Sequence, residues 1–264
     1  MKSHLLALWH YRHFIFSSIK NEFATKFARS RIGGLWMVLH PLAQVAIYAL
    51  ILSNVLAAKL PGIDNPYAYA IYLMAGMLTW SLFAEVLGRC LSVFIDNGNL
   101  LKKMAFPRLA LPLIVSGSAV FTNLLLFAAI LFVFGLLGHI PGLVILWLPV
   151  LMLLTLALAI GLGLSLGVIN VFMRDIGQVM PIVLQFWFWL TPVVYTLHMF
   201  PDMARDWFML NPMTGIVMGY QNVLVYDKAP ELGILLYPAL LALVSLALAL
   251  FLYRRAGEDM ADVL

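Results

Sequence analysis

The chain has 264 residues, of which 64% are hydrophobic and 11% are charged, and its formal net charge is +4. Soluble domains are about half apolar and a quarter charged, so the composition excludes a soluble globular protein, and the positive charge is too small and scattered to indicate nucleic acid. Runs of about twenty apolar residues indicate bilayer-crossing helices, so we expect an all-α, polytopic membrane protein.

Residues 1–34 are expected to form a cytoplasmic amphipathic helix at the membrane interface. Apolar residues recur at every fourth position from Tyr11 to Phe27. Basic residues occupy other faces of the same helix, among them Arg12, Lys20 and Lys26. An apolar stripe beside a basic side is typical of helices that lie in the plane of the membrane surface. The alternative is a solvated helix that packs on a neighbouring domain.

Six apolar segments follow, and we interpret them as membrane spans within residues 35–254. They comprise residues 35–57, 67–93, 110–137, 143–169, 178–198 and 232–253. Lys and Arg are concentrated in the loops on one side, and the positive-inside rule places that side in the cytoplasm. Because the number of spans is even, both termini, including the tail 255–264, are predicted to be cytoplasmic.

The longest internal cytoplasmic segment joins the second and third spans at residues 95–109. It contains an Asn97-Gly98 turn, room for one or two helical turns, and Pro107 as a helix stop. A basic and aromatic segment exposed to the cytosol is suited to docking on another protein. The alternative is a basic loop that only fixes the topology.

Arg174 and Asp175 are the only charged residues between Arg108 and Asp202. Charged side chains are costly in hydrocarbon, so this pair is predicted to lie in a short cytoplasmic turn between the fourth and fifth spans. A sharper hypothesis for the same position is a turn that also touches a partner protein.

Two further patterns concern the interior of the spans. Glu85 and Arg89 lie four residues apart on the second span and are expected to form an ion pair near its cytoplasmic end. The fourth span carries three closely spaced glycines, Gly161, Gly163 and Gly167. These small residues allow close helix contact, either within one subunit or between two.

The fifth span is bracketed by Pro181 and Pro192, which predict a kink or an interruption of the helix. Four consecutive aromatic residues lie between them, at positions 186–189. We interpret these rings either as part of the aromatic belt at a membrane surface or as the lining of a pore for sugars. The second interpretation is open because aromatic faces stack on the apolar faces of sugar rings.

The long outer loop, residues 200–231, is not purely polar. Asn211 and Pro212 predict a helix start, with an N-cap residue followed by proline at the first helical position. An apolar stripe that includes Tyr220 follows. We interpret this segment either as a channel gate or as a surface helix that covers the bundle.

No sequence motif supplies an energy source or a catalytic site. The chain lacks the G-x-x-x-x-G-K-[ST] motif of P-loop ATPases, and its histidines are too dispersed for a metal site. Of the carboxylates that could couple transport to protons, only Glu85 comes near the membrane interior. A transporter of this kind needs a partner at its cytoplasmic face, and no cofactor is expected on this chain.

Four stretches, in order along nearly the whole chain, resemble the membrane subunits of polysaccharide-exporting ABC transporters, the permeases for O-antigen, capsule and teichoic acid. They are RSRIGGLWMVLHPL at 29–42, LLKKMAFPRLALP at 100–112, NVFMRDIGQVMPIVLQFWFWLTPVVY at 170–195 and LNPMTGIVMGYQNVL at 210–224. Each stretch by itself is a weak motif. The four stretches in this order, together with the layout of six spans, are fairly specific for this family.

The resemblance implies a homodimeric channel in the bacterial cytoplasmic (inner) membrane, surrounded by membrane lipid. Each copy would engage a separate nucleotide-binding ATPase subunit, on which ATP and magnesium bind. The substrate would be a polysaccharide linked to undecaprenyl diphosphate. The segment after the fifth span would form short gate helices on the periplasmic side.

The resemblance also implies roles for individual residues. The expected ATPase contacts are Arg12, Lys20, Lys26, Lys102, Lys103, Phe106, Pro107, Arg108, Arg174 and Asp175. The candidate aromatic residues of the channel or the membrane belt are Trp80, Phe83, Phe186, Trp187, Trp189 and Tyr195. The expected periplasmic gate comprises Asn211, Pro212 and Tyr220.

Other functions are compatible with the same sequence. A drug or lipid efflux permease of the same superfamily would share the architecture. A non-transporting membrane scaffold for glycan assembly would recruit no ATPase. A stand-alone channel or ion-coupled carrier is disfavoured because intramembrane charge is scarce.

Overall fold

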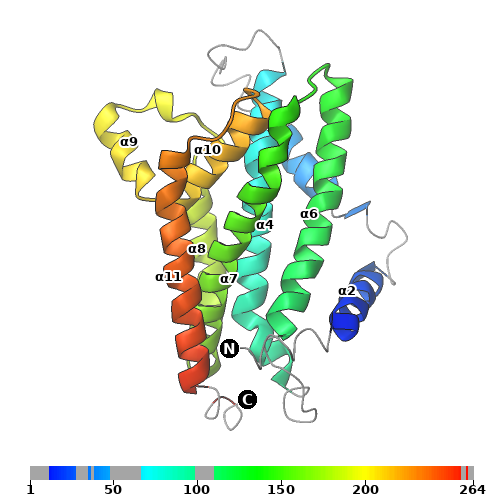
Figure 1. The fold of residues 1–264 in the computed structure, drawn as a ribbon, viewed down its shortest axis with the longest axis vertical. Helices are drawn as coiled ribbons and strands as arrows, with labels where there is room; N and C mark the ends of the chain where they lie inside the picture. The colour runs from blue at the N-terminus through cyan, green and yellow to red at the C-terminus, as the bar shows by residue number, and fades with distance from the viewer. Residues whose placement is uncertain are drawn as a thin grey trace.

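A computed structural model describes residues 12–27, 35–36, 39–47, 67–98, 110–256 and 260, without the side chains of residues 23–27 and Ala204. In these residues the chain forms helices and connecting turns and contains no strand, which confirms the predicted all-α fold (Figure 1). The long helices run side by side along one axis and form an elongated bundle.

Apolar composition accounts for the main helices of the bundle. Those long and apolar enough to cross a membrane are α4 (Ala68–Asp96), α6 (Ala110–Leu136), α7 (Leu148–Phe172) with the short 3-10 helix η2 (Leu143–Trp147) before it, and α11 (Leu232–Ala256). They confirm the predicted second, third, fourth and sixth spans to within three residues at each end. The first predicted span, 35–57, lies mostly outside the described residues.

The fifth predicted span differs most from the structure. α8 (Asp175–Trp189) starts close to the predicted position, but residues 190–196 form turns in place of the rest of the helix. At 1.5 Å per residue, the 15 residues of α8 cover about 22 Å, which is less than the roughly 30 Å of a bilayer core. Six complete spans are therefore not confirmed.

α7 packs against α4 and α11 through glycines. A Cβ added to Gly161 would lie 2.7 Å from the backbone nitrogen of Leu246 on α11. One added to Gly167 would lie 2.6 Å from the carbonyl oxygen of Cys90 on α4. Real Cβ atoms do not come so close to backbone atoms, so the predicted close helix contact is confirmed, and it occurs within one chain.

A short helix, α10 (Pro212–Leu224), packs against α4, α7 and α11 in the bundle (Figure 1). Most of its side chains are buried, and Met213, Ile216 and Val217 are fully inaccessible. The preceding α9 (Asp202–Met209) is largely exposed, and a single turn, η3 (Leu197–Met199), leads into it. This burial does not fit the interpretation of the segment as a surface helix, whereas a gating role stays a prediction.

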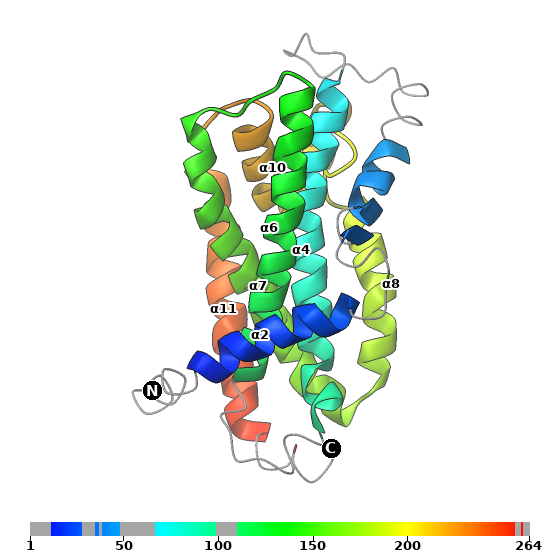
Figure 2. The ribbon, with the colours of Figure 1, turned by 90° about the vertical axis from the view of Figure 1, so that its right-hand side faces the viewer.

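α2 (Arg12–Phe27) lies across the bundle, near the end where α4 finishes and α6 starts (Figure 2). Its Ile19 contacts Gly117 of α6, so part of the predicted apolar stripe faces the bundle. The turn between α7 and α8 lies toward the same end, whereas residues 137–142 and 225–231 lie at the opposite end. The described segments predicted to be cytoplasmic are thus on one side of the bundle.

Candidate functional site

The charge pair Arg174-Asp175 lies in a tight turn, as the sequence predicts. α7 ends at Phe172, α8 begins at Asp175, and both charged side chains are exposed. Asp175 is in the first turn of α8, where a negative charge interacts favourably with the helix dipole. The turn is therefore accessible to a partner, and contact with one stays a prediction.

Asn170, which is 3% exposed, holds this turn against the bundle. Its amide nitrogen donates to the carbonyl oxygen of Leu91 on α4 at 3.1 Å, and its amide oxygen accepts from the backbone N–H of Gly177 on α8 at 2.9 Å. Sequence reasoning missed this role. The signal in the sequence is an asparagine in the last turn of an apolar helix, just before the charge pair.

Arg89 on α4 joins three helices through a set of contacts that we name the Arg89 clamp. Its guanidinium lies 3.6 Å from a carboxylate oxygen of Glu85, which confirms the predicted ion pair. It also forms an ion pair with Glu22 of α2 and donates to the carbonyl oxygen of Val115 on α6 at 3.4 Å. The three charged side chains are only 24–31% exposed, so solvent screens them less than a surface pair. Sequence reasoning missed Glu22.

Exposed charged residues of α2 and of the α7–α8 turn lie toward the same end of the bundle (Figure 2). Arg12 and Lys20 of α2 are exposed, as are Arg174 and Asp175, and we name these four residues the coupling surface. Lys26 belongs to α2, but its side chain lies outside the described part. The remaining expected ATPase contacts lie outside the described residues altogether, namely Lys102, Lys103, Phe106, Pro107 and Arg108.

Some of the expected channel aromatics pack inside the subunit. Trp80 and Phe83 on α4 are 8% and 0% exposed. The ring centroids of Phe83 and Trp187 are 5.2 Å apart, and those of Trp80 and Phe188 are 5.6 Å apart, both with edge-on geometry. Such contacts are favourable for aromatic pairs and fix α8 against α4.

The other expected channel aromatics lie on the outward face of α8 or close to it. Phe186 and Trp189 are 68% and 51% exposed, and Tyr195 is half-buried in the following turns. The exposed amides of Gln178 and Gln185 share a face of α8 with Trp189. Amides facing hydrocarbon would lack hydrogen bonds, so this face suits water or a second polypeptide.

Asn211 connects the end of α8 to the start of α10. Its side-chain oxygen accepts from the backbone N–H of Met213 at 3.0 Å, which confirms the predicted N-cap, and from the indole N–H of Trp187 at 2.8 Å. Its amide nitrogen donates to the carbonyl oxygen of Leu190 and the hydroxyl of Thr191. Pro212 follows as the first residue of α10, and Tyr220 is buried farther along the helix.

The turns at residues 190–196 are held by side chains from two helices. Tyr69 and Tyr72 of α4 donate to backbone carbonyl oxygens of this segment at 2.6 and 2.9 Å. Gln221 of α10 donates to the carbonyl oxygen of Pro192 at 2.9 Å. Buried carbonyl groups need such partners wherever a helix does not supply them. These contacts explain how the chain can leave the helix at Trp189.

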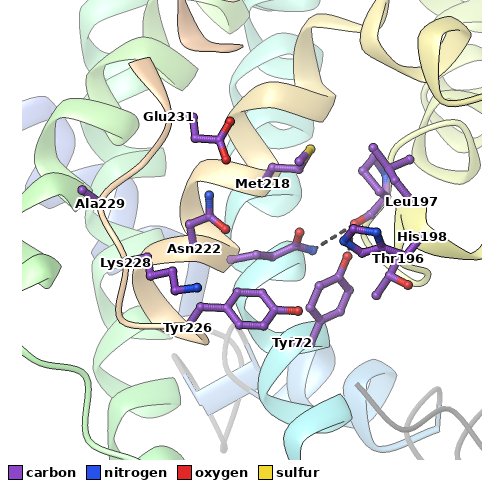
Figure 3. Close-up of a pocket in the computed structure, with 12 residues that line it drawn as sticks. Tyr72, Thr196, Leu197, His198, Met218, Asn222, Tyr226, Lys228, Ala229 and Glu231 are labelled. Carbon is purple, nitrogen blue, oxygen red and sulfur yellow. Dashed lines mark hydrogen bonds between the residues drawn. The ribbon is translucent and has the colours of Figure 1, made fainter. Parts of the chain in front are cut away.

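A cavity of about 300 Å³ lies beside these turns (Figure 3). It is bounded by α4, residues 192–198, α10 and residues 226–231. Its inner wall includes the buried side chains of Tyr72 and Gln221. Exposed residues on its rim are His198, Lys228, Ala229 and Glu231. Sequence reasoning assigned no role to this group, because its members come from segments far apart in the chain.

Among the described residues, no three His, Cys, Asp or Glu side chains lie close enough together to hold a metal ion. Cys90 is a buried, free thiol in the contact between α4 and α7. The candidate sites for binding a partner or a substrate are the coupling surface, the outward face of α8 and the turns at residues 190–196.

Comparison with known proteins adds the family context. A family model for ABC-2 type transporters matches residues 13–225. The chain is 28% identical over 261 residues to the O-antigen export system permease protein RfbA of Myxococcus xanthus, covering 97% of this chain and 96% of the relative. It is 25% identical over 255 residues to the polysialic acid transport protein KpsM of Escherichia coli, covering 90% of this chain and 92% of the relative. A Klebsiella pneumoniae O-antigen export system permease protein RfbA is 24% identical over 206 residues, 76% of each chain.

Proposed function

The chain belongs to the ABC-2 type transporter family, and on that premise we propose that it is the permease subunit of an ABC system that exports a polysaccharide. The observation that carries this proposal is the similarity to export permeases along nearly the whole chain. These relatives are named for O-antigen and for polysialic acid, and both substrates are polysaccharides. The permease itself is not the catalytic subunit.

In this proposal, two copies of the chain form a channel in the bacterial inner membrane, with both termini in the cytoplasm. A separate ATPase subunit binds ATP and magnesium and docks on the coupling surface. The exported glycan is linked to undecaprenyl diphosphate. The missing P-loop motif supports a separate ATPase, and the one-sided distribution of Lys and Arg supports the orientation.

α4 is suited to carry movement from the coupling surface to the opposite end of the bundle. The Arg89 clamp attaches α2 near one end of α4, and Asn170 attaches the α7–α8 turn nearby. At the other end, Tyr69 and Tyr72 hold the turns at residues 190–196. With 29 residues, α4 is about 44 Å long, so a displacement of the ATPase can reach those turns through one helix.

The outward face of α8 is the proposed path for the glycan. Phe186 and Trp189 would offer flat apolar faces to sugar rings, and Gln178 and Gln185 would offer hydrogen bonds to sugar hydroxyls. Two copies of the chain facing each other through α8 would place such a surface on both sides of the path. Asn211 and α10, at the end of α8, form the proposed gate. Because Asn211 accepts a hydrogen bond from Trp187 of α8, the tilt of α8 depends on this contact with the gate.

Two measurements together test the proposed function. We expect a strain that lacks this chain to lose its surface polysaccharide, and the tagged full-length chain to co-purify with an ATPase subunit of the same organism in a complex of two plus two. Vanadate-sensitive ATP hydrolysis in lipid is the readout of that complex.

Each alternative function predicts a different result. A strain that keeps its surface polysaccharide but becomes sensitive to drugs would indicate an efflux permease. A chain that recruits no ATPase would contradict a transporter and favour the scaffold.

A further inference from the structure

The cavity beside residues 190–196 lies at the end of the bundle opposite the coupling surface, and the proposed transport path does not use it. Its volume of about 300 Å³ is at the small end of the range for ligand pockets in proteins. In Figure 3, His198 and Tyr72 lie on one side of the cavity, Lys228 and Tyr226 lie on the other, and Glu231 lies above them in the view. Side chains from four parts of the chain therefore meet around one space.

Several of these polar groups are not used in holding the fold. In the part of the chain that the structure describes, the side chains of His198, Asn222, Tyr226, Lys228 and Glu231 make no hydrogen bond or ion pair. Burial raises the pKa of Tyr226, so its hydroxyl is protonated at neutral pH and can donate. Polar groups that converge without satisfying one another are available to a ligand.

The charges on the rim favour a ligand without net charge. Lys228 and Glu231 carry opposite charges, so a simple anion would meet the carboxylate and a simple cation would meet the ammonium group. A ligand that both donates and accepts hydrogen bonds can satisfy both groups. The tyrosine rings and amides of the wall add flat apolar faces and further donors and acceptors, the combination that a sugar ring needs.

We propose that this cavity binds one uncharged pyranose unit of a polysaccharide at the end of the permease opposite the coupling surface. In this arrangement the sugar hydroxyls accept from Lys228 and Tyr226 and donate to Glu231 and to the amide oxygen of Asn222. The inference rests on the proposed function, because a polysaccharide leaving the channel is the source of the sugar. α10 lines the cavity through Gln221 and Asn222, so the bound sugar would lie directly beside the proposed gate.

Saturation-transfer NMR on the full-length chain in lipid nanodiscs tests this inference. The probes are the methyl α-glycosides of D-glucose, D-galactose, D-mannose and L-rhamnose. We expect at least one glycoside to bind with a dissociation constant on the order of 1 mM, as suits a single small unit. Tyr226→Leu and Asn222→Leu should each reduce its signal at least fivefold. Asp206→Asn, an exposed residue of α9 outside the cavity, should leave the signal unchanged.

Three results would overturn the inference. One is no signal from any of the glycosides at 10 times the expected dissociation constant. Another is a glycoside signal that the two cavity variants do not change, while both remain folded by circular dichroism. The third is a signal from phosphoethanolamine, in place of the glycosides, that Lys228→Met and Glu231→Gln remove, because it would assign the cavity to a lipid headgroup. Glycoside binding is measured without export, so these results leave the proposed function standing. That function is contradicted by an intact surface polysaccharide in the deletion strain or by a chain that recruits no ATPase.

Discussion

α4 and α8 lie against each other, but they differ in length and in burial. α4 has 29 residues, and 78% of its most apolar stretch is buried. It is attached to other segments near both of its ends. α8 has 15 residues, of which only Met180 and Phe188 are buried, and its outward face carries exposed rings and amides. Under the proposed function this difference corresponds to a division of roles, in which α4 provides stability and transmits movement and α8 provides the surface for the glycan.

Replacing one phenylalanine on each helix should separate these roles most clearly. Phe83→Ala on α4 removes a fully buried ring that contacts Trp187, so the free energy of unfolding should fall by about 3–5 kcal/mol. Phe186→Ala on α8 removes a ring that is 68% exposed and should change stability by less than about 0.5 kcal/mol. Thermal unfolding in detergent compares the two, and equal losses would contradict the division of roles. Export by Phe186→Ala should still fall several-fold.

A pair of glycine substitutions tests whether α4 depends on close packing with α7. Gly167→Ala places a methyl group 2.6 Å from the carbonyl oxygen of Cys90, and we expect a loss of about 1–3 kcal/mol. Gly88→Ala is the matched control on α4, since nothing lies within 4 Å of the added methyl group. It should be neutral or stabilise the helix by up to about 1 kcal/mol. Equal unfolding temperatures for the two variants would contradict close packing between α4 and α7.

Asn211→Ala should weaken the attachment of α8 to α10. It removes the N-cap of α10 and the hydrogen bond to Trp187, and caps of this kind contribute about 1–2 kcal/mol. Asn211→Asp is the control, because it keeps both acceptor contacts and loses only the two donor contacts. We expect its melting temperature to lie between those of the wild type and Asn211→Ala. A wild-type melting temperature for Asn211→Ala would contradict a holding role.

Charge reversal on the coupling surface should have the smallest effect on stability. Arg174 is exposed in the turn before α8, so Arg174→Glu should change stability by less than about 0.5 kcal/mol. If the turn contacts the ATPase, the ATPase subunit bound to this variant still hydrolyses ATP, but little polysaccharide is exported. The same result is expected for Arg108→Glu, whereas Arg174→Lys should export normally. Normal export by both glutamate variants would remove the docking assignment.

The sequence predicts the features that depend on local composition and local chemistry. The ends of four long helices follow from apolar content, and the start of α10 follows from Asn211 and Pro212, because N-capping involves only neighbouring residues. The Glu85–Arg89 pair is also local, with one helical turn between its members. Each of these predictions needs no knowledge of the rest of the fold.

The features that the sequence does not predict depend on distant contacts. Pro192 predicts an interruption of the fifth span, and the turns after Trp189 agree with it. The hydrogen bonds that hold these turns could not be predicted, because Tyr69, Tyr72 and Gln221 come from other helices. Glu22 meets Arg89 although 67 positions separate them in sequence. Apolar content alone cannot show that a helix will stop early or that two charged residues will meet.

The most direct test of transmission through α4 is a charge exchange in the Arg89 clamp. Arg89→Glu places three carboxylates together, so α2 should detach from α4, and export should fall more than tenfold while the ATPase subunit continues to hydrolyse ATP. Adding Glu22→Arg restores opposite charges between α2 and α4 and should recover at least half of wild-type export. Export at the wild-type level in Arg89→Glu, or no recovery in a folded double variant, would contradict the claim that movement passes from α2 into α4.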